Sequence, residues 1–158
     1  KNLISYLKSK FKKVSYRSIE KQSLHTKVIS NHVALLAKNK KVREIINKFQ
    51  KKIIKNNKKI CVEGRDIASK ILVKNPQYDL AFYFKCNINI ASHRRWIDIK
   101  KKVSLKQVKT SLRKRTQMDK KRKNSPLIKV KDSILIRTDK LTKKQVLSKM
   151  SKYIEKYN

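Results

Sequence analysis

Ile60-Cys61-Val62-Glu63-Gly64-Arg65-Asp66-Ile67 is the stretch from which the fold can be argued. Its apolar run stops at Gly64, the only glycine in 158 residues, and an Arg-Asp pair follows. A short apolar run that breaks at a glycine and continues into the helix-compatible segment from Asp66 to Leu72 predicts a buried strand, a turn and a helix. Ligands of open α/β sheets bind beyond the carboxyl ends of the strands. We therefore expect Arg65 and Asp66 to lie at the edge of a site.

The rest of the chain alternates between the same two kinds of element. Strands are predicted over 80–84 and 133–138, and helices over 28–54 (one or two), 90–102, from Ser104 to Pro126, and from Leu141 onward with Thr142 as N-cap. The segment over 1–27 begins with a short amphipathic piece and carries no recognisable chemistry. Strands that alternate with helices favour a parallel α/β sheet with helices on both faces.

The charge of the chain is its most unusual property. The 45 basic and 10 acidic residues give a net charge of +35, which points to a polyanionic partner such as RNA or the ribosome. A second explanation is compositional, because Lys, Asn and Ile are abundant together, as in proteins encoded by AT-rich genomes. That bias leaves the scarcity of Asp and Glu unexplained, so both explanations stay open.

Length and cysteine usage set the class of protein. A chain of 158 residues with 39% apolar residues is long enough to bury the core of one domain. Cys61 and Cys86 lack the spacing of a zinc site or a disulfide framework, and we interpret them as reduced core residues. No apolar run approaches the roughly 18 residues of a membrane span, and no signal-peptide core is visible. We expect a soluble, cytoplasmic protein with no membrane partner, and a fragment or processed chain because it begins with Lys1.

Arginine stands out in three places: Arg65 beside Asp66, the triplet His93-Arg94-Arg95, and the run over 113–123. A guanidinium presents a planar fork to phosphate oxygens, and a nearby carboxylate can hold that fork in place. Each grouping also has a structural explanation, because a charge run is usually a solvated helix face and an Arg-Asp pair is often a structural salt bridge. Only their combination in an α/β fold favours a phosphate site.

The sequence resembles a known family, the bacterial-type cytidylate kinases, which move a phosphoryl group from ATP to CMP or dCMP. The resemblance covers more than four-fifths of the chain and keeps the order of the family's motifs. It runs through Leu24-His25-Thr26-Lys27-Val28-Ile29-Ser30-Asn31, Val42-Arg43-Glu44, Val62-Glu63-Gly64-Arg65-Asp66-Ile67, His93-Arg94-Arg95, Arg115-Thr116-Gln117-Met118-Asp119-Lys120-Lys121-Arg122 and Ser125-Pro126-Leu127.

The resemblance implies a P-loop kinase-like three-layer sandwich, whose N-terminal part would precede Lys1. Residues 28–158 would form the core, with a helical lid over about 100–126. Residues 1–27 would be the remnant of a monophosphate-binding insert or flap. The implied ligands are CMP or dCMP, ATP and Mg²⁺, with no metal-binding side chain in this chain.

The resemblance also assigns roles to individual residues. Arg43, Arg65 and Asp66 correspond to CMP-site residues, the aspartate reading the cytosine or the sugar and the arginines holding the monophosphate. Lid residues that complete this pocket correspond to Arg115, Asp119 and Arg122. The basic pair at the entry to the lid, on the ATP side, corresponds to Arg94 and Arg95. Stabilisation of charge during transfer would fall to Arg94, Arg115 and Arg122.

This sequence departs from the family pattern at several positions. The family has other residues where this chain has His25, Ala34, Met118 and Ala68-Ser69. A phosphate-cradling loop of the GxxxxGK type needs glycines, and the single glycine is already used at position 64. Two hypotheses follow: a cytidylate kinase whose P-loop part is missing from this sequence, or a non-catalytic descendant recruited to RNA or the ribosome.

Overall fold

The computed structural model describes residues 2–14, 36, 39–74 and 76–157. It divides into two compact units, Lys1–Val62 and Glu63–Asn158. Among the helices of the described ranges, none combines the length and the apolar character needed to cross a bilayer.

The described part of the first unit contains two packed helices, α1 (Leu3–Lys13) and α4 (Lys40–Lys55). Each begins at an asparagine whose side-chain oxygen accepts a hydrogen bond from a backbone N–H of the first turn, which has no carbonyl partner within the helix. Phe11 and Phe49 join the two helices, with ring centroids 4.9 Å apart. The helix predicted within 28–54 is confirmed from Lys40 onward; its earlier part lies almost wholly outside the described residues.

The second unit contains a parallel two-stranded sheet, as the alternating pattern predicts. Strand β1 (Phe82–Lys85) pairs with β2 (Ile134–Arg137), and Phe82 lies opposite Ile134. Ile136 is fully buried and anchors the sheet. Both strands fall within or one residue beyond the predicted ranges. The predicted α/β class with a parallel sheet is therefore confirmed.

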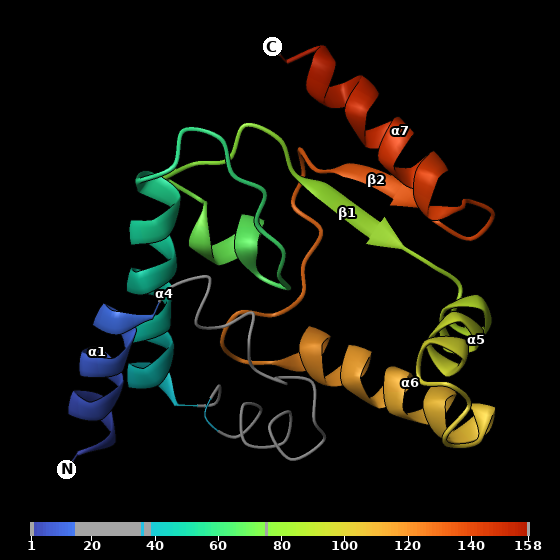
Figure 1. Ribbon diagram of the computed structural model, residues 1–158, viewed down its shortest axis with the longest axis horizontal. Helices are drawn as coiled ribbons and strands as arrows, with labels where there is room; N and C mark the ends of the chain where they lie inside the picture. Colours follow the sequence, from blue (N-terminus) through green and yellow to red (C-terminus); the bar gives the residue numbers. More distant parts are fainter. Residues whose placement is uncertain (1, 15–35, 37–38, 75, 158) are drawn as a thin grey trace. The chain divides into compact units, whose positions relative to one another are not determined.

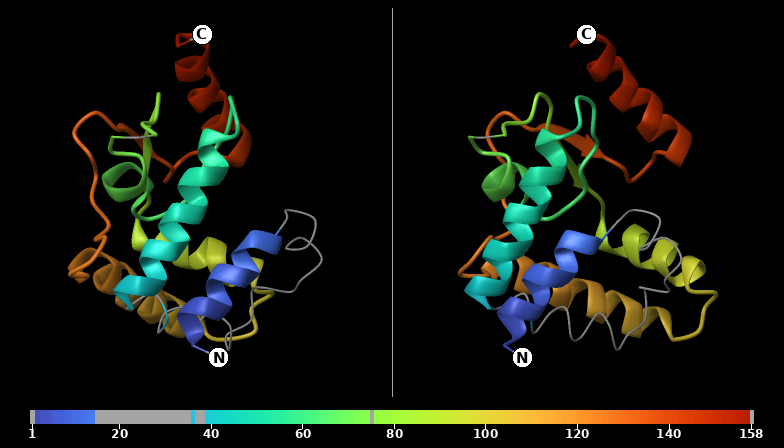
Figure 2. Two further views of the ribbon diagram at one scale, coloured as in Figure 1. Left: turned by 90° about the vertical axis from the view of Figure 1, so that its left-hand side faces the viewer. Right: turned by 60° about the vertical axis from the view of Figure 1, so that its left-hand side comes forward.

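Three helices complete this unit: α5 (Ile88–Asp98), α6 (Leu105–Lys121) and α7 (Lys143–Glu155). Figure 1 shows α7 beside the strands and the packed α5–α6 pair on their other side; the turned views of Figure 2 agree. Capping boxes formed by Ser104 with Gln107 and by Thr142 with Gln145 start α6 and α7, and the predicted N-cap at Thr142 is confirmed. Helix α5 ends earlier than predicted because the backbone turns left-handed after it.

The strand predicted for the opening stretch is wrong. Residues 60–64 adopt neither helix nor strand, and a single π-helical turn, η1 (Ile67–Ile71), follows. A strand needs a hydrogen-bonded neighbour and a core to cover, but Ile60 is 44% exposed and Cys61 is exposed. The interpretation of Cys61 as a core residue is wrong for the same reason, whereas Cys86 is half-buried.

Candidate functional site

Arg65, Asp119 and Arg122 form an ion cluster within the second unit. Arg65 Nε lies 3.6 Å from Asp119 Oδ2, and Arg122 Nη2 lies 3.3 Å from Asp119 Oδ1. The carboxylate is the most covered of the three side chains, with 13% of its surface exposed, against 30% for Arg122 and 44% for Arg65. Two guanidinium groups thus share one shielded carboxylate, which leaves a net positive charge.

Three local features bring these side chains together. Arg65 lies in the bend between Gly64 and η1, Asp119 in the last turn of α6, and Arg122 directly after that helix. A Cβ atom at Gly64 would lie 2.5 Å from Ile67 Cγ1, so glycine lets the bend fold closely onto η1. The cluster therefore joins the glycine turn to the end of α6.

The cluster leaves hydrogen-bonding capacity unused. Asp119 Oδ2, Arg122 Nε and Arg122 Nη2 are buried and have no hydrogen-bond partner, because the ion pairs are too long or poorly aligned. Buried polar atoms are normally paired, and each exception calls for an explanation. Planar N–H donors beside an excess positive charge suit a phosphate group, which can bind both arginines through charge-assisted hydrogen bonds.

Arg94 belongs to a different arrangement, at the carboxyl ends of the two strands. Its Nη2 donates to the backbone oxygens of Thr138, Asp139 and Leu141, at 2.9, 3.2 and 3.2 Å. The Asp139 carboxylate accepts from the backbone N–H of Asn87, the N-cap of α5. Arg94 therefore joins α5 to the segment between β2 and α7.

The remaining residues assigned from the sequence lie on several elements. Arg43 is half-buried on α4 in the first unit, and Asp66 is half-buried as the residue before η1. Arg95 and Arg115 are exposed, and Arg115 precedes Asp119 by four residues, which places both on one face of α6. The structure thus brings together Arg65, Asp119 and Arg122, and gives Arg94 its own set of partners.

Sequence reasoning missed two contacts that shape the second unit. The Leu127 N–H donates to the backbone oxygen of Asp119 at 2.8 Å and folds the chain back onto α6. Near the amino ends of the strands, the Tyr78 hydroxyl donates to the Asp132 carboxylate at 2.8 Å. Desolvation, this hydrogen bond and the carboxylate charge together raise the pKa of Tyr78. No spacing rule pairs residues 54 positions apart, so the sequence carried no signal for the second contact.

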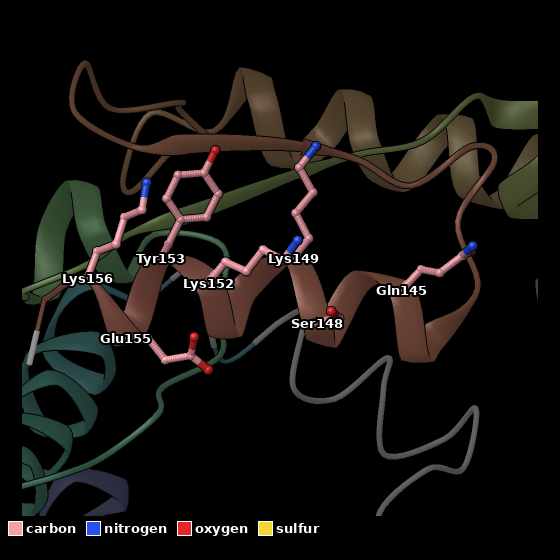
Figure 3. Close-up of a pocket in the computed structure, with 7 residues that line it drawn as sticks. All are labelled: Gln145, Ser148, Lys149, Lys152, Tyr153, Glu155 and Lys156. Carbon is pink, nitrogen blue, oxygen red and sulfur yellow. The ribbon is translucent and has the colours of Figure 1, made fainter.

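A cavity of about 720 Å³ lies along α7. Figure 3 shows Lys149, Tyr153 and Lys156 pointing to one side of the helix and Glu155 to the other. Three of the lining side chains are lysines at three- and four-residue steps, which places them on one face. The complete lining is Gln145, Ser148, Lys149, Lys152, Tyr153, Glu155 and Lys156.

The parallel sheet with its helices defines an α/β protein, and the cluster of Arg65, Asp119 and Arg122 is its candidate site for an anionic ligand. The chain belongs to the cytidylate kinase family, because the family model described as Cytidylate kinase matches residues 2–156. Several curated relatives carry that name, and three of them illustrate the match. The protein of Caldanaerobacter subterraneus subsp. tengcongensis is 30% identical over 138 residues, 85% of this chain and 60% of the relative. That of Rickettsia akari is 28% identical over 144 residues (89% and 62%). That of Alkaliphilus oremlandii is 30% identical over 148 residues (92% and 63%). The chain therefore spans about three-fifths of the length of these curated relatives.

Proposed function

We propose that this chain supplies the CMP- or dCMP-binding part of a nucleoside monophosphate kinase, which transfers a phosphoryl group from ATP to give CDP or dCDP. The observation that carries the proposal is the Arg65–Asp119–Arg122 cluster, with its buried, unpartnered hydrogen-bonding atoms. Membership of the cytidylate kinase family supports the choice of nucleotide. Asp66 follows Arg65 directly and would read the base or the sugar.

The proposed chemistry needs positioning and charge stabilisation more than it needs a base. The attacking group is a phosphate oxygen that is already ionised, so no side chain has to remove a proton. Arg122 and the exposed Arg115, both within the proposed lid over about 100–126, would neutralise charge on the transferring group. For Arg94 the role is narrower, because its Nη2 already serves three carbonyls and only its remaining N–H groups could reach a phosphate.

The residues that the structure describes do not form a site that fits ATP and Mg²⁺. The single glycine of the chain, Gly64, precedes a bend and a π-turn, and a phosphate-cradling loop needs several glycines. In the part of the chain that the structure describes, no three His, Cys, Asp or Glu side chains are grouped for a metal ion. The residues of this chain are therefore proposed to bind the acceptor nucleotide and the transferring group, and none of them is assigned to hold ATP or Mg²⁺.

The proposal is tested by calorimetric titration of the 158-residue chain with CMP, cytidine and inorganic phosphate. We expect CMP to bind more tightly than either part alone, because the cluster holds the phosphate while other residues hold the nucleoside. Arg65→Ala and Arg122→Ala should each weaken CMP binding about tenfold or more, since a hydrogen bond to a charged group contributes about 1.5–3 kcal/mol. Arg113→Ala removes an exposed arginine of α6 and serves as the matched control. CMP binding no tighter than that of inorganic phosphate would refute the proposal.

The proposed role of Asp66 has its own test. Asp66→Ala should bring the affinities for CMP and UMP closer together while the circular dichroism spectrum and the melting temperature stay near those of the parent chain. An unfolded Asp66→Ala chain would instead make the residue a structural partner.

A second candidate function is binding of an RNA backbone along α7. The face that carries Lys149, Lys152 and Lys156 lines a cavity beside Tyr153, within a chain of net charge +35. Lysines in a groove neutralise phosphates without reading sequence, so affinity should fall steeply between about 50 and 200 mM salt. Changing these three lysines to Glu should reduce the salt dependence more than the same change at Lys106, Lys114 and Lys121 of α6. Equal effects of the two triple variants would remove α7 as the site.

A further inference from the structure

The chain reverses direction after α6 through an unusual turn. Helix α6 ends at Lys121, and the chain then passes through Ser125, which is 94% buried and has a φ of 57°. Pro126 follows directly. The turn ends where the Leu127 N–H meets the backbone oxygen of Asp119.

This backbone conformation is unfavourable for a serine at this position. A positive φ brings the Cβ atom too close to the carbonyl oxygen, and a following proline further restricts a residue toward extended conformations. Such residues persist only where their surroundings hold them, and they gather at ligand sites and clamps. The other non-glycine residues with positive φ in the described ranges, Lys100 and Lys101, are exposed in the turn between α5 and α6.

The strained turn encloses two of the three residues of the ion cluster. Asp119 lies at the helical side of the turn, where its backbone oxygen accepts from Leu127. Arg122 lies inside the turn, three residues before Ser125, and its Nη2 faces the Asp119 carboxylate at 3.3 Å. A change of φ at Ser125 would therefore alter the path of the chain between Arg122 and the Leu127–Asp119 hydrogen bond.

We propose that the turn over 122–127 is a positioning device for the monophosphate site, and that Ser125 is its key residue. The left-handed Ser125 closes the end of α6, and the closed turn holds Arg122 and Asp119 beside Arg65. Ser125 acts through its backbone conformation and does not itself contact the nucleotide. This inference rests on the proposed CMP site but concerns what keeps that site assembled.

Two substitutions at Ser125 separate backbone conformation from side-chain chemistry. Ser125→Val introduces a β-branched residue that strongly resists positive φ, and we expect the affinity for CMP to fall about tenfold. Ser125→Gly also removes the hydroxyl but adopts positive φ freely, so it should keep the parent affinity within about twofold. Ser125→Ala, with a milder resistance to positive φ, should fall between them and replaces the valine variant if that chain does not fold.

The matched controls are Lys100→Val and Lys100→Gly, because Lys100 has the same backbone conformation, with a φ of 55°, in another turn of the same unit. Lys100→Val should lower the melting temperature but leave the affinity for CMP unchanged. Equal losses of affinity in the valine variants of Ser125 and Lys100 would overturn the proposal, because the effect would then be general destabilisation. Equal losses in the valine and glycine variants of Ser125 would also overturn it.

A measurement without nucleotide keeps this inference distinct from the proposed function. Hydrogen exchange of the Leu127 N–H reports the bond to Asp119 directly. Its protection should be kept in Ser125→Gly and lost in Ser125→Val, while amides of α7 keep theirs. That pattern would support the turn even if the parent chain did not bind CMP, an outcome that refutes only the proposed function. Unchanged protection in Ser125→Val would overturn the inference.

Discussion

Arg94 and Arg122 are both arginines of one folded unit, but they use their guanidinium groups in opposite ways. Arg94 donates to three backbone oxygens and joins α5 to the segment after β2. Arg122 has two buried nitrogens without a hydrogen-bond partner, although it lies 3.3 Å from a carboxylate. We expect an arginine that donates to the backbone to stabilise the fold, and we propose that one with unused donors beside a shared carboxylate binds a ligand. Variants of Arg94 should therefore lose stability, whereas variants of the cluster around Arg122 should lose affinity for the nucleotide.

The largest expected effect is on stability, at Arg94. Arg94→Ala should lower the free energy of unfolding by about 2 kcal/mol, since it removes charge-assisted hydrogen bonds to the backbone. Arg94→Lys should recover little, because an ammonium group on a flexible chain cannot reproduce the planar donor geometry. Urea unfolding followed by circular dichroism measures the change.

Arg95→Ala is the matched control for Arg94, as an exposed neighbour on the same helix. It should change the free energy of unfolding by less than about 0.5 kcal/mol. If the two alanine variants proved equally stable, the three carbonyl contacts would contribute nothing measurable to stability. The proposed difference in role between Arg94 and Arg122 would then be refuted.

The next largest effect is expected at Gly64, which precedes Arg65 of the ion cluster and allows the chain to bend there. Gly64→Ala should cost about 1–2 kcal/mol, because its Cβ would lie 2.5 Å from Ile67 Cγ1 and force a rearrangement. In an Ile67→Ala background the same change should be nearly neutral, and a double-mutant cycle in urea measures this coupling. An equal cost in both backgrounds would mean that the close approach is not what requires glycine.

Much of the second unit could be predicted from the sequence because its signals are local. Ser104 and Thr142 each precede a glutamine by three residues, and both form the capping boxes that this spacing allows. The strand over 60–62 was predicted wrongly because a run of three apolar residues does not reveal whether a neighbouring strand exists. Periodicity describes a segment, whereas a strand depends on its partner.

The candidate site could be predicted only in part, for a related reason. The resemblance to cytidylate kinases named Arg65, Asp119 and Arg122, and the structure brings these three together. The same resemblance placed Arg94 among the lid residues, and no sequence pattern reveals that its donors serve backbone oxygens. The strained turn at Ser125 was equally hidden, because a residue before proline is expected to be extended.

Asp119 should show the reverse of the result at Arg94. Asp119→Ala removes the carboxylate that holds two guanidinium groups together, so the affinity for CMP should fall about tenfold. The free energy of unfolding should change by only about 1 kcal/mol, because both arginines are partly exposed and their attraction to Asp119 is screened by solvent. Calorimetric titration with CMP measures the affinity, and urea unfolding of the same preparation measures the free energy of unfolding.

Asp119→Asn and Asp98→Ala serve as controls for this variant. The asparagine keeps the shape without the charge and should behave like the alanine variant if the charge orders the arginines. Asp98 is an exposed carboxylate at the end of α5, and its removal should leave the affinity for CMP unchanged. A large loss of stability with unaltered affinity in Asp119→Ala would make the cluster a structural contact like that of Arg94.

The smallest effect is expected near the amino ends of the strands, where the Tyr78 hydroxyl donates to the Asp132 carboxylate. The pKa of Tyr78 is raised by desolvation and by the carboxylate, so the folded state holds this proton more tightly than the unfolded chain does. The stability from this contact is therefore fully present below the unfolded pKa of about 10 and is lost as the pH rises through the folded value.

Urea unfolding at about pH 8 and about pH 11 should show a slightly smaller loss of stability at alkaline pH in Tyr78→Phe than in the parent chain, while Tyr83→Phe matches the parent. The affinity for CMP should not change in Tyr78→Phe, because the single hydroxyl donor of Tyr78 is already bound to Asp132. An alkaline loss that is identical in all three chains would show that the Tyr78 proton is not linked to folding.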